Sequence, residues 1–274
     1  MADEILTTSI DELASIAVAE ANLSLRNGID LASLITRRDL APGQISVRFP
    51  IYASVAAAAL TEGNEAANTA VTTTGVVLTP TTNAVIAHAI TDLADHAAPQ
   101  LMVDLGRKAA DAIRKKRNAD IFALFDGFSN ALGTTNVDIT EALIRQAKKI
   151  LMQNDADGIP YLVLTPEVAE DLLGLYSLNT SNTADNVRDA VYAGQMPVIY
   201  GVRPFVINGP TETTDLKCGM FTREALGIAV AWEVKVEIQR RAKLVGYDFV
   251  ASSAYAVGEI NDGYGVELLV DGAD

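Results

Sequence analysis

The sequence is poor in aromatic residues, and one long central stretch has none. No Phe, Trp or Tyr lies between Tyr52 and Phe122, and no Lys or Arg lies between Arg48 and Arg107. Large side chains supply most of the burial that offsets the entropy of folding, so this stretch is not expected to build its own core. Its β-branched runs at 71–78 and 84–86 still predict strands. Because an isolated hairpin is marginal in water, we expect a two-stranded arm that lies on another copy of the chain.

Cysteine and positive charge are also scarce. Cys218 is the only cysteine, which excludes an internal disulfide and a cysteine-based zinc site and suits a reducing compartment. The 21 Lys and Arg are outnumbered by 35 Asp and Glu, so the net charge is −14. This sign argues against a general affinity for nucleic acids or anionic membranes. No apolar run approaches the roughly 18 residues of a membrane span, and no signal peptide is recognisable. We therefore expect a soluble, cytosolic protein that does not bind membranes.

The N-terminal region predicts an arm without a core. Apolar residues recur at helical spacing from Ser9 to Arg26, and a second short apolar segment runs from Ile29 to Ile35. Residues 44–50 then alternate as a strand that leads into the aromatic-free stretch. Pro80 restricts the strand that returns from it to an edge or irregular strand.

A long helix is expected next, beginning near Pro99 and reaching Phe125, about 40 Å at 1.5 Å per residue. Its spacing predicts that Leu101, Leu105, Ala109 and Ala112 are buried and that the basic run 114–117 is exposed. Phe122 and Phe125, the first aromatic residues after the bare stretch, are expected to join this helix to the second half of the chain.

The second half predicts an α/β layer. An amphipathic helix is expected over 140–153, a buried strand over 161–165, a helix from Pro166 to Tyr176 and a strand within 197–208. This alternation indicates helices around a mixed sheet. Strands dominate from Leu226 to Val270, and the polar alternation at 234–239 is typical of a sheet with one solvated face. A turn at 261–265 precedes the last strand.

Few residues suggest a catalytic or ligand-binding role. His88, Asp92 and His96 would share one face of a helix and could bind a metal; in an extended segment they would separate and form a polar surface instead. The run Arg114, Lys115, Lys116 and Arg117 could contact phosphate, although salt bridges with acidic neighbours are the more usual role of such a run. The glycines at 258–265 open no helix, and the serines lack a nucleophile elbow. We predict no catalytic residues and no cofactor.

The order of these parts points to a family. Local similarities lie at 88–95, 118–127, 162–167, 201–206 and 221–229, which read HAITDLAD, NADIFALFDG, LVLTPE, GVRPFV and FTREALGIA. In this order the chain resembles the major capsid proteins of tailed phages of the Hong Kong 97 type. The resemblance implies an α+β fold with an N-terminal arm (1–46), an extended β-loop (47–98), a spine helix (99–127) and a mixed α/β axial domain (128–231). Peripheral strands (232–260) and a return strand with the C-terminus (261–274) complete it.

The resemblance implies a structural protein rather than an enzyme. Its subunits would form pentamers and hexamers that close into an icosahedral shell around double-stranded DNA, without sequence-specific binding. The shell would be the virion capsid, assembled in the host cytoplasm, and separate scaffolding, portal and decoration proteins are the further partners to consider. Two alternatives are an encapsulin-type compartment, which shares the fold, and a small α/β enzyme with a dimerising β-arm.

Contacts between subunits can be assigned to candidate residues. Some family members cross-link a loop lysine to an asparagine of a neighbour, but the first lysine here is Lys108, so the extended loop has no lysine to supply. Noncovalent contacts are expected instead. Loop residues Glu62 and Glu65 would pair with basic residues of another subunit, for which the run 114–117 is a candidate. Packing of the N-terminal arm would use Leu13, Ile16 and Leu25.

Overall fold

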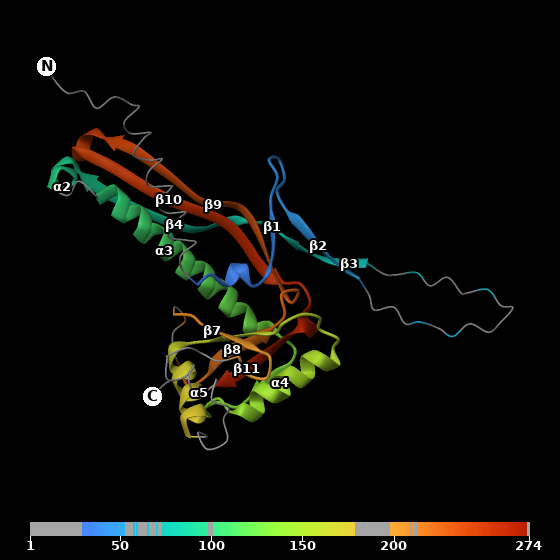
Figure 1. Cartoon of the computed structure of the whole chain (residues 1–274). Helices are drawn as coiled ribbons and strands as arrows, with labels where there is room; N and C mark the ends of the chain where they lie inside the picture. The colour runs from blue at the N-terminus through green and yellow to red at the C-terminus, as the bar shows by residue number, and fades with distance from the viewer. Residues whose placement is uncertain are drawn as a thin grey trace.

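The computed structural model describes residues 29–52, 73–97, 101–178, 198–208 and 213–272, together with single positions at 57, 59, 65, 70 and 210. Two layered units share one continuous hydrophobic core. A long sheet with one helix along it forms the first unit, a smaller sheet with two helices forms the second, and a narrow two-stranded arm projects from their junction (Figure 1).

The long sheet has four strands in the order β1-β9-β10-β4. Strands β9 (Leu226–Arg241) and β10 (Gly246–Glu259) form an antiparallel hairpin that turns through the 3-10 helix η3 (Ala242–Leu244). Strand β4 (Thr81–Thr91) pairs with β10 at one edge, and β1 (Thr36–Asp39) pairs in parallel with β9 at the other. Strand β4 is at an edge of the sheet, as expected, and Pro80 lies just before it in the two-residue link from β3.

Helix α3 (Leu101–Phe122) lies along this sheet and continues as the 3-10 helix η2 (Ala123–Gly127) (Figure 1). Its buried apolar residues are Ala109, Ala110, Ile113, Ile121 and Phe122. The prediction that Ala112 is buried was wrong: Ala112 is exposed, and Ile113 is on the buried face in its place. With 22 residues, α3 is about 33 Å long.

The smaller sheet is mixed, as predicted, with strand order β5-β11-β8-β6-β7. The strands are β5 (Ala131–Gly133), β6 (Tyr161–Leu164), β7 (Arg203–Val206), β8 (Leu216–Phe221) and β11 (Gly265–Val270). The β11–β5 and β6–β7 pairs are parallel, whereas β11–β8 and β6–β8 are antiparallel. The short 3-10 helix η4 (Asp262–Tyr264) lies in the turn before β11.

Two helices accompany this sheet. Helix α4 (Glu141–Gln153) begins after Thr140, whose hydroxyl accepts from the Leu143 N–H, and it buries Ile144, Ala147 and Leu151 as its periodicity predicted. Helix α5 (Pro166–Leu178) starts with proline in its first turn, where the missing N–H costs nothing.

An aromatic cluster joins the two units. The Phe125 ring is fully buried, with its centroid 5.4 Å from Phe221 of β8, 5.1 Å from Phe122 and 6.1 Å from Phe128. The expected role of Phe122 and Phe125 is confirmed. Strand β9 also runs without interruption across positions 231 and 232, where the expected axial and peripheral segments meet.

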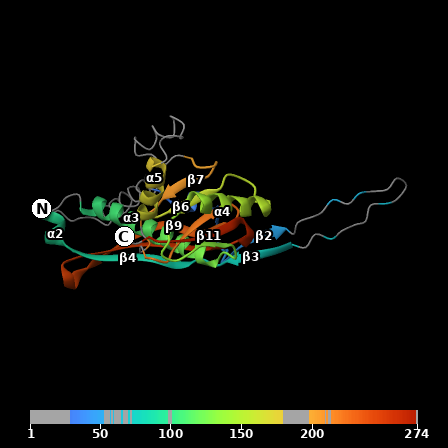
Figure 2. The same cartoon turned by 90° about the horizontal axis from the view of Figure 1, so that it is seen from below.

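The arm is formed by β2 (Val47–Tyr52) and β3 (Thr73–Leu78), paired antiparallel from Val47–Leu78 to Tyr52–Thr73. Phe49 and Leu78 anchor its base against Ala229 of β9 in a small separate core. Figures 1 and 2 show the arm extending away from both sheets. A two-stranded projection is therefore confirmed, but only one of its strands, β3, comes from the predicted pair at 71–78 and 84–86. Residues 84–86 lie instead in β4 of the long sheet, where they pair with β10, so the extended loop expected over 47–98 is shorter than predicted.

The segment after residue 28 differs from the expectation of an arm without a core. The 3-10 helix η1 (Leu31–Ser33) and β1 belong to the folded body, and Leu31, Leu34 and Ile35 are buried in the main core. The apolar positions fit a helix as well as a buried 3-10 turn and strand, so periodicity could not separate the two. The short helix α2 (Asp92–Ala97) follows β4. Among the described helices, none combines the length and hydrophobicity of a membrane span.

Candidate functional site

The metal site considered from the sequence does not form. His88 is an exposed residue of strand β4, whereas Asp92 begins helix α2 and His96 lies in its last turn. The extended conformation separates the three side chains, and no group of three metal-binding side chains occurs anywhere in the described part of the chain. Asp92 has another role: both its oxygens accept from Arg240, at 2.5 and 2.8 Å, and this hydrogen bonding lowers the pKa of the Asp92 carboxyl. His88, Asp92 and His96 are therefore part of a polar surface.

The basic run on α3 makes salt bridges within the subunit. Arg114 pairs with Asp111 at 3.0 Å, and Lys116 pairs with Asp120 at 2.5 Å. Arg117 corrects the prediction that the whole run is exposed, because its side chain is only 2% exposed and pairs with Asp30. Arg117 is thus excluded as a partner for the loop of another subunit, whereas Lys115 is exposed.

The Arg117 pair belongs to a network that fastens the N-terminal segment to α3. Asn118 accepts from the Leu31 N–H and donates to the Ile29 carbonyl, both at 3.0 Å. Asp30 also accepts from the Ala32 N–H, at 3.0 Å, and so caps η1. These bonds fasten residues 29–32 to α3.

A second contact of α3 reaches the long sheet. The Tyr255 hydroxyl on β10 donates to Asp120 of α3 at 2.7 Å. Burial, followed by this hydrogen bond to a carboxylate, raises the pKa of Tyr255 well above its ordinary value. The phenol therefore stays protonated at every physiological pH, and it links β10 to α3 beside the Arg117 pair.

The arm offers a surface for another subunit. Within the described residues, strands β2 and β3 pair only with each other, so each has an outer edge at which another strand can pair. Tyr52 is 69% exposed and Val77 is 55% exposed. Glu65 is exposed, while Glu62 and the arm residues Leu13, Ile16 and Leu25 lie outside the described residues. Their assigned contacts stay predictions.

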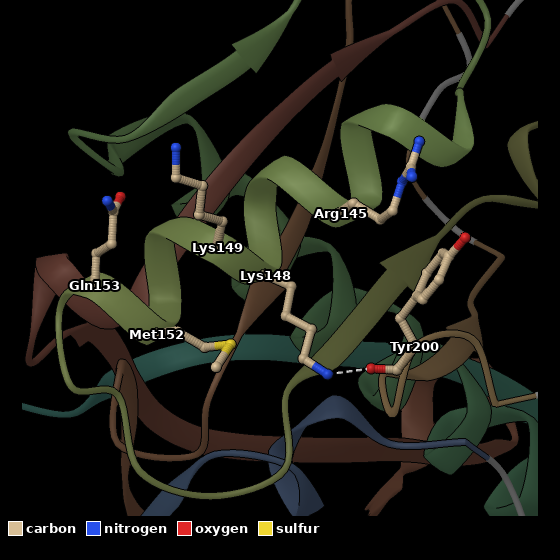
Figure 3. A pocket seen from close by; sticks show the side chains of 6 residues that line it. All are labelled: Arg145, Lys148, Lys149, Met152, Gln153 and Tyr200. Carbon is tan, nitrogen blue, oxygen red and sulfur yellow. Dashed lines mark hydrogen bonds between the residues drawn. The ribbon is translucent and has the colours of Figure 1, made fainter.

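A shallow cationic groove on α4 was missed in the sequence analysis. Arg145, Lys148, Lys149, Met152 and Gln153 line it together with Tyr200 (Figure 3). Lys148 donates to the Tyr200 carbonyl oxygen, and the Arg145 guanidinium lies 5.9 Å from the centroid of the Tyr200 ring. The run RQAKK on a helix with a single acidic residue was the signal that could have found it.

Comparison with solved structures finds similar folds among capsid proteins and virus-like particles. The chain is similar to the capsid of Ralstonia phage GP4 (9% identity, TM-score 0.67, covering 88% of each chain). It is similar to the capsid of the cyanophage P-SCSP1u (16% identity, TM-score 0.62, covering 88% of this chain and 87% of that one). A virus-like particle from Pyrococcus furiosus is also similar (14% identity, TM-score 0.61, covering 94% of this chain and 98% of that one). No family model and no curated protein matches the sequence. Across most of its length, this chain has the fold of phage capsid proteins.

Proposed function

We propose that this protein is the major capsid protein of a tailed phage and that its fold is of the Hong Kong 97 type. The observation that carries the proposal is the likeness to a phage capsid over 88% of both chains, which is far more than one motif. Subunits would form pentamers and hexamers and close into an icosahedral shell around double-stranded DNA.

The arm gives a physical reason for assembly. It has few large side chains, and its anchoring core holds only its base. The unpaired edges and exposed side chains of β2 and β3 are stabilised when a neighbouring subunit covers them. Contacts between different surfaces of identical subunits close into rings when the rotation allows it.

The charge of the chain suits a container for DNA. A net charge of −14 repels phosphate overall, so packaged DNA would not adhere to the wall, and recognition of its sequence is not required. Assembly in the host cytoplasm, with separate scaffolding, portal and decoration proteins as partners, fits this role.

Covalent cross-linking through the extended loop is not part of the proposal, because residues 47–98 contain no lysine. Shell strength would come from pairing of the arm and packing of the N-terminal segment. Boiling mature particles in detergent and reductant, followed by gel electrophoresis, should give one band at the monomer mass. A ladder of covalent multimers would overturn this part of the proposal.

A second candidate is an encapsulin-type compartment. The likeness to the virus-like particle from Pyrococcus furiosus, which extends over 94% of this chain and 98% of that one, does not distinguish a compartment from a virion. The contents of the particles separate the two functions: nuclease-protected DNA supports a virion, whereas an enclosed protein supports a compartment.

Electron microscopy and light scattering of the purified protein test the shared conclusion. We expect rings or closed shells in equilibrium with smaller species. A sharp monomer at all protein concentrations and salt conditions would refute shell formation. A uniform small oligomer that converts a substrate would instead favour the enzyme with a dimerising arm.

A further inference from the structure

The groove on α4 is a cationic surface on a strongly acidic chain. Three cations lie within five residues of α4, and Glu141 is the only acid in the helix. Arg145 and Lys149 are exposed. Within the described ranges, Arg145, Lys148 and Lys149 make no ion pair with this chain's own carboxylates. Like charges held so close repel one another, so an external anion would stabilise this surface.

The Tyr200 turn holds one side of the groove in place. Tyr200 and Gly201 both have positive φ, 51° and 78°, in a tight turn closed by hydrogen bonds of 3.1 and 2.8 Å between Ile199 and Val202. A tyrosine in this conformation is uncommon and costs free energy. The Lys148 ammonium offsets part of that cost by binding the Tyr200 carbonyl. Ring, turn and helix therefore form one preorganised surface (Figure 3).

Helix α5 has the opposite charge. Its sequence, PEVAEDLLGLYSL, contains Glu167, Glu170 and Asp171 but no Lys or Arg. Glu170 is exposed, and Leu175 is 37% exposed. Since Glu167 and Asp171 already interact within the chain, Glu170 is the acid best placed to contact another molecule.

The two helices lie toward opposite ends of the smaller sheet. Helix α4 contacts β5, β11 and β8, which form one end of the strand order β5-β11-β8-β6-β7. In both views α5 lies beside β7, the strand at the other end (Figures 1 and 2). A contact between opposite ends of identical subunits is heterologous, and its repetition by rotation produces a ring.

We propose that the cationic surface of α4 in one subunit binds the acidic face of α5 in the next subunit of the ring. The inference rests on the proposed shell function and deepens it by naming one contact and its chemistry. The occupant is a second copy rather than nucleic acid, because the neighbour in a homomeric ring supplies a complementary acidic helix on which Glu170 is exposed. The contact should also speed the association of subunits, since opposite charges steer their encounter.

A charge exchange tests the contact. The variants are Lys149→Glu, Glu170→Lys and the double variant, with Lys108→Glu as the matched control because Lys108 is an exposed lysine of α3. Each single variant should raise the protein concentration needed for ring or shell formation about tenfold, the equivalent of about 1.4 kcal/mol per contact. The double variant should restore assembly to within about threefold of wild type, and the control should assemble normally.

Several outcomes would overturn the inference. One is a double variant that assembles no better than its worse single parent. Another is a Lys149→Glu shell that forms normally but protects less DNA from nuclease, which would assign the groove to nucleic acid. Circular dichroism of each variant confirms that the subunit still folds. If the wild type forms rings and the charge-exchange variants assemble equally well, only the α4–α5 contact is refuted. If the wild type forms no ring, the proposed function is refuted as well.

Discussion

Replacing Phe125 with alanine should be among the most damaging single changes in the core. The ring is fully buried and contacts three other aromatic rings, at centroid distances of 5.1 to 6.1 Å. It lies where η2 meets β8, so the cavity would open between the two units. Phe122 is 7% exposed and has its closest aromatic neighbour in Phe125.

The expected magnitude follows from known large-to-small substitutions. Removal of a buried phenylalanine side chain costs about 3 to 5 kcal/mol. Phe125→Ala should lie near the upper end, at about 5 kcal/mol, because three aromatic contacts are lost together. Phe122→Ala should lie near the lower end, at about 3 kcal/mol, because its ring is nearer the surface.

Gly219 provides a sharper test of the same packing. A Cβ built on Gly219 would lie only 2.6 Å from the Phe125 ring, so Gly219→Ala should cost about 1 to 3 kcal/mol in wild type. In Phe125→Ala the ring is gone, and the new methyl group would enter the cavity. The cost of Gly219→Ala should then fall to nearly zero, so the two substitutions are strongly coupled.

The assay is equilibrium urea denaturation of the four proteins of this cycle. All must be measured at one protein concentration, because association adds to the apparent stability of an assembling protein. Additive free energies of unfolding, within about 0.5 kcal/mol, would refute the packing described for Phe125 and Gly219.

Three further predictions concern the N-terminal fastening, a buried carboxylate and the arm. Asp30→Ala should destabilise the subunit by about 3 to 5 kcal/mol, because it leaves the buried Arg117 guanidinium without a carboxylate. Asp30→Asn should cost less, because the asparagine side chain can still cap η1. Equal midpoints of urea denaturation for the two variants would contradict this prediction. Glu267 is 7% exposed, and burial raises the pKa of its carboxyl, so the folded state holds this proton more tightly and stability falls as pH rises from the ordinary glutamate pKa through the raised one. Glu267→Gln should flatten that pH dependence in thermal melts, and an unchanged profile would show that Lys217, at 3.8 Å, offsets the burial. Deleting residues 61–70 should leave the circular dichroism and melting of the subunit intact but prevent shell formation, and normal shells in micrographs would exclude the arm as an assembly element.

The sequence predicted the elements whose pattern depends on one local rule. The edge strand after Pro80, the amphipathic helix expected over 140–153 and the aromatic junction at Phe122 and Phe125 were all found close to where they were expected. The helix follows from a local repeat of apolar residues. The junction was indicated by the first large side chains after a stretch that has none, although its partner Phe221 is distant in the sequence.

Features that depend on distant partners were not predictable. Arg117 belongs to a basic run, and nothing near it in the sequence indicates that Asp30, 87 residues away, would draw it into the core. His88 fits a helical face equally well, and only its pairing with Phe249 of β10 makes it part of a strand. The cationic groove needed Tyr200, which a turn brings to α4 from beyond the end of α5.

The continuity between the arm and the long sheet has a mechanical consequence. Strand β3 ends at Leu78 and β4 begins at Thr81, so only Thr79 and Pro80 separate the arm from the edge of the sheet. A pull on the arm therefore travels along β4, whose ladder to β10 runs from Thr81–Tyr255 to Thr91–Gly246. Antiparallel hydrogen bonds lie perpendicular to the strands, so such a load acts in shear and must break many bonds together rather than one at a time. Tension between neighbouring subunits would be carried by the whole length of β4.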